Sequence, residues 1–252
     1  WALSSIPLNN IWVLWTNVKS FKGIKSRYED IDLVIVRENT EGLYSGIEHK
    51  IGDYGAETIK IITKPACERI CEFAFNYAKD NNRKKVTGVH KANIMKLSDG
   101  LFLNTFRDIA SKYPDIKSDD LIVDAACMNL VINPEKYDVM VMPNLYGDIV
   151  SDLCSGLVGG LGMIPGANIG KDYAVFEAVH GSAPDIAGKN IANPTAIIQS
   201  SVMMLRYLGE QEAAAKIENA LIKVFEKGEN LTGDLGGNAT TDEFTNEILK
   251  YI

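Results

Sequence analysis

The 252-residue sequence lacks the features that mark several common classes of protein. No apolar run reaches the roughly 18–20 residues that a membrane-spanning helix needs. The apolar N-terminal segment has no basic start, which a secretory signal would carry. No stretch concentrates Lys and Arg and the net charge is −7, so nucleic acid is a poor partner. The composition, 46% hydrophobic and 23% charged, is that of a soluble globular protein.

Cysteine is scarce and shows no CxxC spacing: the chain has Cys67, Cys71, Cys127 and Cys154. Cys67 and Cys71 lie four residues apart on a predicted helix, a spacing that can hold a metal ion. Small buried thiols in a reducing compartment are the favoured interpretation. We therefore expect a cytoplasmic protein, or one of the mitochondrial matrix if the source is eukaryotic.

Strand-like and helix-like segments alternate along the chain, a pattern typical of an α/β protein. Thr63 is expected to cap the first helix and Pro65 suits its first turn. Between Tyr44 and Ile62 a strand-like but polar segment predicts an extended hairpin arm, a common device in dimers. The other predicted strands are Asp32–Val36, Val86–His90, Leu121–Asp124, Asp138–Met142 and Ala174–Ala178, and the other helices are Asp99–Lys112, Ile149–Val158, Pro194–Leu208, Glu210–Glu226 and Thr241–Tyr251.

Two polar stretches follow predicted strands, where α/β enzymes place their sites. In the first, Arg37 can fork onto a carboxylate, and Tyr44 can donate a proton from its phenol. A solvated turn with a structural ion pair is the alternative. In the second, Lys91 can have its pKa lowered by partial desolvation and so transfer protons. A lysine on its own is usually a surface residue, and His90 beside it is more often a core histidine than a ligand.

Three aspartates are candidate metal ligands. Asp148 and Asp152 lie four residues apart at the start of a predicted helix, so their carboxylates face the same way. With Asp124 at another strand end they suit a hard cation such as Mg²⁺ or Mn²⁺. Helix capping is the alternative for Asp148, but capping does not account for Asp152.

A loop of small residues follows the strand that ends at Ala178. In residues 180–188 (HGSAPDIAG) the backbone can approach a ligand closely. Asp185 can accept both hydroxyls of an adenosine ribose and would repel a 2′-phosphate. The chain has no GxGxxG motif, and residues 159–162 (GGLG) do not replace it, so a standard Rossmann site is not predicted.

Together these stretches resemble the β-decarboxylating dehydrogenase family, which includes isocitrate, isopropylmalate, homoisocitrate and tartrate dehydrogenases. The resemblance is carried by RENTEGLY, HKAN, NLYGDIVSDL and HGSAPDIAGKNIANP, and runs from about Ser20 to Ile252. It implies a two-domain, isopropylmalate dehydrogenase-like α/β fold, not a standard Rossmann fold, assembled as a homodimer or larger oligomer. Residues 17–159 would form the small domain with the arm and the metal and substrate residues, and 160–252 the C-terminal half of the large, NAD-binding domain.

The resemblance also implies roles for single residues. Arg37 would bind a substrate carboxylate, and Tyr44 and Lys91 would be the acid and base. Mg²⁺ or Mn²⁺ would be held by Asp124, Asp148 and Asp152, some of them reaching across the dimer. Asp185 and Ile186 resemble the pair found in relatives that use NAD rather than NADP. NAD would contact Asn93 near its nicotinamide, and His180, Gly181, Ser182, Ala183, Asp185, Ile186 and Asn193.

The implied reaction is the metal-assisted oxidative decarboxylation of isocitrate to 2-oxoglutarate, a step of the tricarboxylic acid cycle. Residues 45–49 (SGIEH) favour isocitrate, whereas Leu43 keeps homoisocitrate open beside 3-isopropylmalate. A non-catalytic regulatory subunit is an alternative of another class, against which Asp148 and Asp152 argue; an inactive fragment is a third. Residues 1–16 match nothing in the family, whose members carry a glycine-rich turn and a substrate-reading helix near their start. We therefore expect an N-terminally truncated or altered chain with the large domain incomplete.

Overall fold

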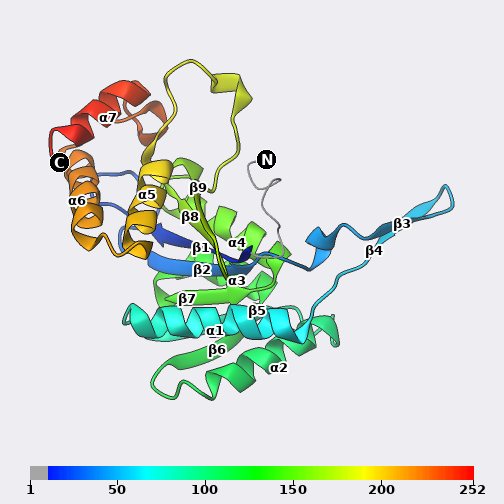
Figure 1. Ribbon diagram of the computed structural model, residues 1–252. Helices are drawn as coiled ribbons and strands as arrows, with labels where there is room; N and C mark the ends of the chain where they lie inside the picture. The colour runs from blue at the N-terminus through cyan, green and yellow to red at the C-terminus, as the bar shows by residue number, and fades with distance from the viewer. Residues whose placement is uncertain (1–10) are drawn as a thin grey trace. The chain divides into compact units, whose positions relative to one another are not determined.

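The computed structural model describes residues 11–252, and ten residues of the segment expected to be unmatched lie outside this range. The chain has the predicted mixed α/β fold (Figure 1). Contacts divide it into two compact units. Among the described residues, the first holds 11–15, 33–151 and 168–174, and the second holds 16–32, 152–167 and 175–252. The domain boundary expected after residue 159 stays a prediction.

The first unit is built on a largely parallel sheet with neighbouring strands in the order β6-β5-β7-β2-β1. In it, β5 pairs in parallel with both β6 and β7, and β2 pairs in parallel with β7. Residues 33–36 of β2 are fully buried, as the continuous apolar run predicts for a strand covered on both faces. The bounds are β1 Ile11–Lys19, β2 Asp32–Glu38, β5 Lys85–His90, β6 Lys117–Ile122 and β7 Val139–Met142.

Two helices, α1 (Lys64–Asp80) and α2 (Ser98–Ala110), supply much of the first unit's core. Phe75 of α1 and Phe106 of α2 lie 5.6 Å apart between ring centroids, among the buried valines of β2, β5 and β7. The side chain of Thr63 accepts a hydrogen bond from the backbone N–H of Ala66, which confirms the predicted cap.

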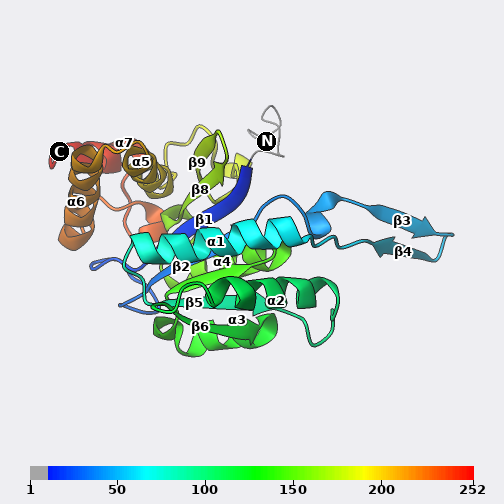
Figure 2. The same ribbon diagram turned by 60° about the horizontal axis from the view of Figure 1, so that its bottom comes forward.

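The predicted hairpin is present and extends away from the rest of the first unit (Figure 2). Its strands β3 (Glu48–Ile51) and β4 (Gly55–Thr58) pair antiparallel, with Glu48 opposite Thr58. Every residue of both strands is exposed, so nothing in residues 11–252 covers the hairpin. Its role in a dimer stays a prediction.

Two sequence expectations about the first unit were wrong. The strand expected at Leu121–Asp124 ends at Ile122, and Asp124 lies in the first turn of helix α3 (Val123–Ile132). The apolar residues of this helix give no clear helical stripe, which explains the error. Helix α4 (Asn144–Leu157) begins at Asn144 and not at Ile149. Asp148 is therefore inside the helix and not its cap; a glycine in the first turn hid the start.

The second unit packs three helices together. Phe225 of α6 and Phe244 of α7 are fully buried, with ring centroids 6.2 Å apart. Strands β8 (Pro165–Gly170) and β9 (Ala174–Ala178) are neighbours and, like β1, have residues in both units. The helices are α5 Thr195–Tyr207, α6 Gln211–Lys227 and α7 Thr241–Leu249.

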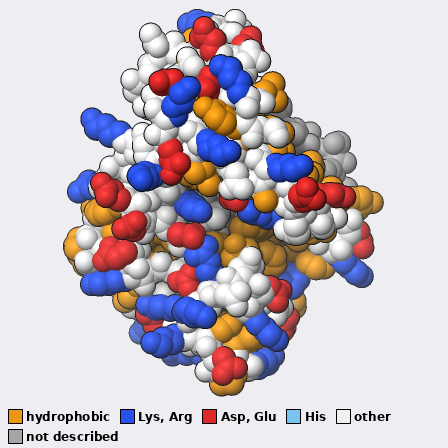
Figure 3. Space-filling model, turned by 90° about the vertical axis from the view of Figure 1, so that its left-hand side faces the viewer, with side chains coloured by type: hydrophobic (Ala, Val, Ile, Leu, Met, Phe, Trp, Pro, Cys, Tyr) orange, Lys and Arg blue, Asp and Glu red, His pale blue; other side chains and the backbone are white. Residues whose placement is uncertain are grey.

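Charged side chains of both signs are interspersed on the face of the molecule shown in Figure 3. Within residues 11–252, no helix is long and apolar enough to cross a membrane.

Candidate active site

Arg37 lies at the C-terminal end of β2, beside the point where β7 leads into α4. Its Nη1 donates to Oδ1 of Asp148 at 2.6 Å, and its Nε donates to Oδ1 of Asn144 at 2.9 Å. The guanidinium also lies 5.0 Å from the centre of the Tyr44 ring. The structure thus brings together Arg37, Tyr44 and Asp148, which we call the arginine cluster.

Helix α4 shapes the place that Arg37 occupies. A Cβ added at Gly147 would lie 2.4 Å from Cγ and 2.5 Å from Cβ of Arg37, so only glycine fits there. Asn144, which is buried, accepts from Arg37 and donates from Nδ2 to the backbone oxygen of Glu41 at 3.1 Å. The sequence analysis did not single out either residue, although both stand in the NLYGDIVSDL stretch.

Tyr44 is about half exposed within this chain. Burial of its phenol raises its pKa, and a hydrogen bond to the carboxylate of Asp148 raises it further, against the opposing effect of Arg37. The phenol therefore stays protonated at neutral pH, as a proton donor must.

Lys91 and Asp124 form a second group, which we call the lysine cluster. The ammonium of Lys91 donates to a carboxylate oxygen of Asp124 and lowers the pKa of that carboxyl. The backbone N–H of Lys91 donates to Oδ2 of the buried Asp99 at 2.7 Å. Lys91 is partly buried and ion-paired, so it is not a free surface lysine.

His90 is a satisfied core histidine, as the simpler interpretation of the sequence had it. Its Nδ1 accepts the backbone N–H of Ala92 at 3.0 Å, so Nε2 carries the proton and faces Oδ2 of Asp120 at 3.2 Å. Burial opposes ionisation of Asp120, but hydrogen bonds from Arg107 and His90 outweigh it and lower the pKa of that carboxyl. His90 thereby supports the turn that carries Lys91.

The three predicted metal ligands are not assembled within one chain. Asp148 is bound to Arg37 and Asp124 to Lys91, while Asp152 lies exposed on α4, one turn after Asp148. In the part of the chain that the structure describes, no three His, Cys, Asp or Glu side chains lie close enough to hold a metal ion. Asn93 is exposed in the first unit.

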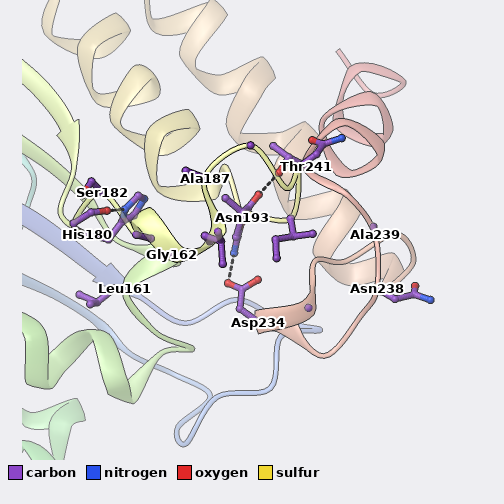
Figure 4. Close-up of a pocket in the computed structure, with 18 residues that line it drawn as sticks. Leu161, Gly162, His180, Ser182, Ala187, Asn193, Asp234, Asn238, Ala239 and Thr241 are labelled. Atoms are coloured by element: carbon purple, nitrogen blue, oxygen red, sulfur yellow. Dashed lines mark hydrogen bonds between the residues drawn. The ribbon is translucent and has the colours of Figure 1, made fainter.

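The second unit contains a pocket of about 1190 Å³ formed by the loop that was predicted to bind NAD (Figure 4). Six predicted cofactor residues line it, whereas Asp185 is not among its lining residues. Backbone and small side chains make up most of the wall, and Ala183 adopts a positive φ of 42° that is uncommon for a residue other than glycine. The predicted residues in the wall are His180, Gly181, Ser182, Ala183, Ile186 and Asn193.

The far wall of the pocket was missed by the sequence analysis. Asp234 points toward Asn193, whose Nδ2 donates to Oδ2 of Asp234 at 2.9 Å (Figure 4). Thr232 donates to the other oxygen at 2.6 Å. The stretch 233–237 (GDLGG) could have indicated this part of the pocket, because it combines glycines and one aspartate as the 180–188 loop does. None of the described residues that line the pocket is Lys or Arg, so these residues offer no cation to a phosphate.

The chain has an α/β fold, candidate acid and base groups near its strand ends and a separate glycine-lined pocket. This combination is typical of an enzyme. The match to known proteins is more specific: the chain belongs to the isocitrate/isopropylmalate dehydrogenase family, whose profile matches residues 8–248. This confirms the family, the fold class and the enzyme class expected from the sequence.

Several relatives are similar over nearly the whole chain. A Drosophila melanogaster protein, named as the probable alpha subunit of mitochondrial NAD isocitrate dehydrogenase, is 56% identical over 251 residues, which is 98% of this chain and 67% of the relative. A Dictyostelium discoideum protein, named as a regulatory subunit of mitochondrial NAD isocitrate dehydrogenase, is 55% identical over 98% of this chain and 71% of its own length. The crystal structure of isocitrate dehydrogenase from Methylococcus capsulatus superposes with a TM-score of 0.92 at 51% identity, covering 95% of this chain and 73% of that one.

Proposed function

We propose that this chain carries catalytic residues for the oxidative decarboxylation of isocitrate to 2-oxoglutarate with reduction of NAD. The arginine cluster is the observation that supports this most directly. It places a cation for a carboxylate, a protonated phenol and an acidic side chain together at the end of β2. The names of the Drosophila relative and of the Methylococcus structure favour isocitrate as the substrate.

The chain's own residues account for the binding and proton steps. Arg37 binds a carboxylate of the substrate through its planar fork of donors. Lys91, in its neutral amine form, takes the proton of the substrate hydroxyl as that carbon is oxidised, and loss of the β-carboxylate as carbon dioxide then leaves an enolate. Tyr44, whose raised pKa keeps it protonated, returns a proton to the enolate carbon. NAD supplies the hydride acceptor when it is bound.

The three aspartates fit a divalent cation by their chemistry. Carboxylate oxygens are the ligands that Mg²⁺ and Mn²⁺ prefer, and Asp148 and Asp152 stand one turn apart on α4. Asp124 has a lowered pKa and is ionised at neutral pH. When bound, the cation supplies a Lewis acid that polarises the substrate oxygen.

We further propose that the complete site forms between two copies of the chain. Within one chain, Asp124 is held in the lysine cluster and Asp148 in the arginine cluster, and no three acidic side chains of residues 11–252 assemble. Two copies can combine the lysine cluster of one with the arginine cluster of the other. The uncovered hairpin, with Tyr54 at 88% exposure, is a surface on which two copies can pair in a homodimer or larger oligomer.

The pocket of the second unit is the proposed NAD site. Its glycine-rich wall admits close approach of the backbone, and its described lining has one carboxylate and no cation. Asp185, next to the lining residue Ile186, adds negative charge against the 2′-phosphate of NADP. The contact of Asn93 with the nicotinamide stays a prediction.

Two alternatives keep specific support. The Dictyostelium relative is named as regulatory, so a regulatory role is the second candidate. The presence of Asp124, Asp148 and Asp152 favours the catalytic role. Homoisocitrate and 3-isopropylmalate are the alternative substrates within the family. The mitochondrial names of the eukaryotic relatives favour the mitochondrial matrix over the cytoplasm for a chain of eukaryotic source.

The test is NADH formation from isocitrate with Mg²⁺ or Mn²⁺ by the gene product that contains this chain. Tyr44→Phe should reduce kcat by at least about 100-fold, since a positioned proton donor contributes roughly 10²–10⁴-fold. Asp148→Asn should also reduce kcat, since it removes a proposed ligand of the cation and weakens the pairing with Arg37. Asp108→Asn, at an exposed position of α2, is the matched control and should keep full activity. Turnover of 3-isopropylmalate but not isocitrate, or full activity in both site variants, would contradict the proposal.

A further inference from the structure

Asp99 is a buried carboxylate to which the proposed mechanism gives no role. It lies in the first turn of α2, and its side chain is fully buried. Its Oδ1 accepts from the ammonium of Lys60, and its Oδ2 accepts from the hydroxyl of Tyr146 at 2.8 Å and from the backbone N–H of Lys91 at 2.7 Å. All four residues belong to the first unit.

Both carboxylate oxygens of Asp99 accept hydrogen bonds. A buried carboxylate is costly unless it has a cation and further hydrogen bonds. Lys60, with a side chain only 12% exposed, supplies the cation and also lies 3.2 Å from the Tyr146 hydroxyl and 4.5 Å from the ring centre. The Tyr146 hydroxyl is itself buried and donates to Asp99.

The partners of Asp99 connect it to both clusters. Lys91 belongs to the lysine cluster, and the bond to its backbone N–H fixes the start of the Lys91 side chain. Tyr146 stands two residues before Asp148. It is followed directly by Gly147, and Arg37 packs against this glycine. One carboxylate therefore holds the turn that carries the proposed base and the first turn of the helix that shapes the arginine cluster.

We propose that Asp99 is a positioning residue, which holds Lys91 and helix α4 in the geometry that the reaction needs. The expected fall in kcat rests on the proposed function, whereas the expected change in the pairing of Lys91 does not. A displacement of about 1 Å at a reacting group can reduce a rate by roughly 100-fold. Loss of Asp99 should therefore lower kcat, while the NAD pocket, whose lining lies wholly in the second unit, is left unchanged.

The experiment compares Asp99→Asn with Asp108→Asn, an exposed aspartate of the same helix. Three quantities are measured on the gene product that contains this chain: kcat, the Kd for ADP-ribose, which lacks the nicotinamide that Asn93 is predicted to contact, and the rate at which Lys91 is reductively methylated, followed by peptide mass spectrometry. For Asp99→Asn we expect kcat to fall 10- to 100-fold with the Kd for ADP-ribose within twofold, and Lys91 to be methylated at least threefold faster as its pairing with Asp124 loosens. Methylation of the exposed Lys112 should not change.

Tyr146→Phe is the second variant, because Asp99→Asn can fail to fold. It removes one donor to Asp99 and keeps the ring and both other bonds. We expect a three- to tenfold fall in kcat and faster methylation of Lys91. Folded variants with unchanged kcat and unchanged Lys91 methylation would overturn the proposal, even if their thermal stability fell, because Asp99 would then be only structural. If even the unmodified protein does not oxidise isocitrate, the proposed function fails, and the methylation rates still decide the positioning role.

Discussion

Gly147 offers a direct test of the arginine cluster, because Arg37 occupies the space that a side chain at this position would need. In Gly147→Ala the new Cβ would lie 2.4–2.9 Å from Cγ, Cβ and Cδ of Arg37, distances at which one side must move. Because Cβ of Arg37 is one of the clashing atoms, a change of its rotamer does not relieve the clash, so β2 or α4 must shift and the guanidinium moves away from Asp148 and Asn144. A charge-assisted contact to a carboxylate is worth about 1.5–3 kcal/mol. Loss of that contact to the substrate should lower kcat/KM for isocitrate by about 10- to 150-fold.

Gly156→Ala is the matched control on the same helix, since a Cβ there meets nothing within 4 Å. Alanine is favoured over glycine inside a helix by about 1 kcal/mol, so Gly156→Ala should raise the free energy of unfolding and leave kcat/KM unchanged. In Gly147→Ala the same gain is offset by overpacking of about 1–3 kcal/mol. Both variants are assayed for NADH formation and for urea unfolding. Full activity of Gly147→Ala would refute the packing argument, and an equal loss in Gly156→Ala would show that the effect is not specific to Arg37.

Three further predictions concern the cofactor, the acid group and stability. If Asp185 faces the adenosine ribose as proposed, it would repel a 2′-phosphate, and the described pocket lining has no Lys or Arg; kcat/KM should therefore be at least tenfold higher with NAD than with NADP, and equal values would contradict this. Because the pKa of Tyr44 is raised above its ordinary 10.0, ionisation of this phenol should not reduce kcat below pH 10; a fall near pH 8 that disappears in Tyr44→Phe would count against it as the acid. Thr240→Ala removes the capping box formed with Glu243, and should lower the free energy of unfolding by about 1 kcal/mol in urea titration.

The sequence predicted elements best where local signals were strong. Thr63 and Pro65 fixed the start of α1, because a hydroxyl cap and a proline in the first turn act within four residues. The buried run of β2 was equally clear, since a parallel strand covered on both faces is apolar at every position. In the stretch that follows this strand, the guanidinium of Arg37 lies 5.0 Å from the ring centre of Tyr44.

Errors arose where distant contacts override local pattern. Strand β1 (Ile11–Lys19) was not predicted, although most of its residues are apolar, β-branched or aromatic and the family profile begins at residue 8. Asp124 was placed on a strand but lies in α3, whose residues show no apolar stripe. The pairing of Asp234 with Asn193 joins segments forty-one residues apart, and no spacing rule predicts such a contact.

The two clusters also explain how one chain can fold with these charged side chains partly buried when no ligand is bound. In each cluster an ion pair within the chain compensates the charge. Arg37 is only 11% exposed, and a buried guanidinium without a partner would be strongly destabilising. Asp148 supplies that partner, as Asp124 does for Lys91. An anion that takes Arg37 leaves Asp148 unpaired, and a cation that takes Asp148 frees Arg37. If Asp148 binds the cation as proposed, each binding event removes the cost of the other, and a carboxylate and a divalent cation would favour each other at this site. This coupling follows from a salt bridge within one chain, and it matches the ligand pair on which the proposed reaction depends.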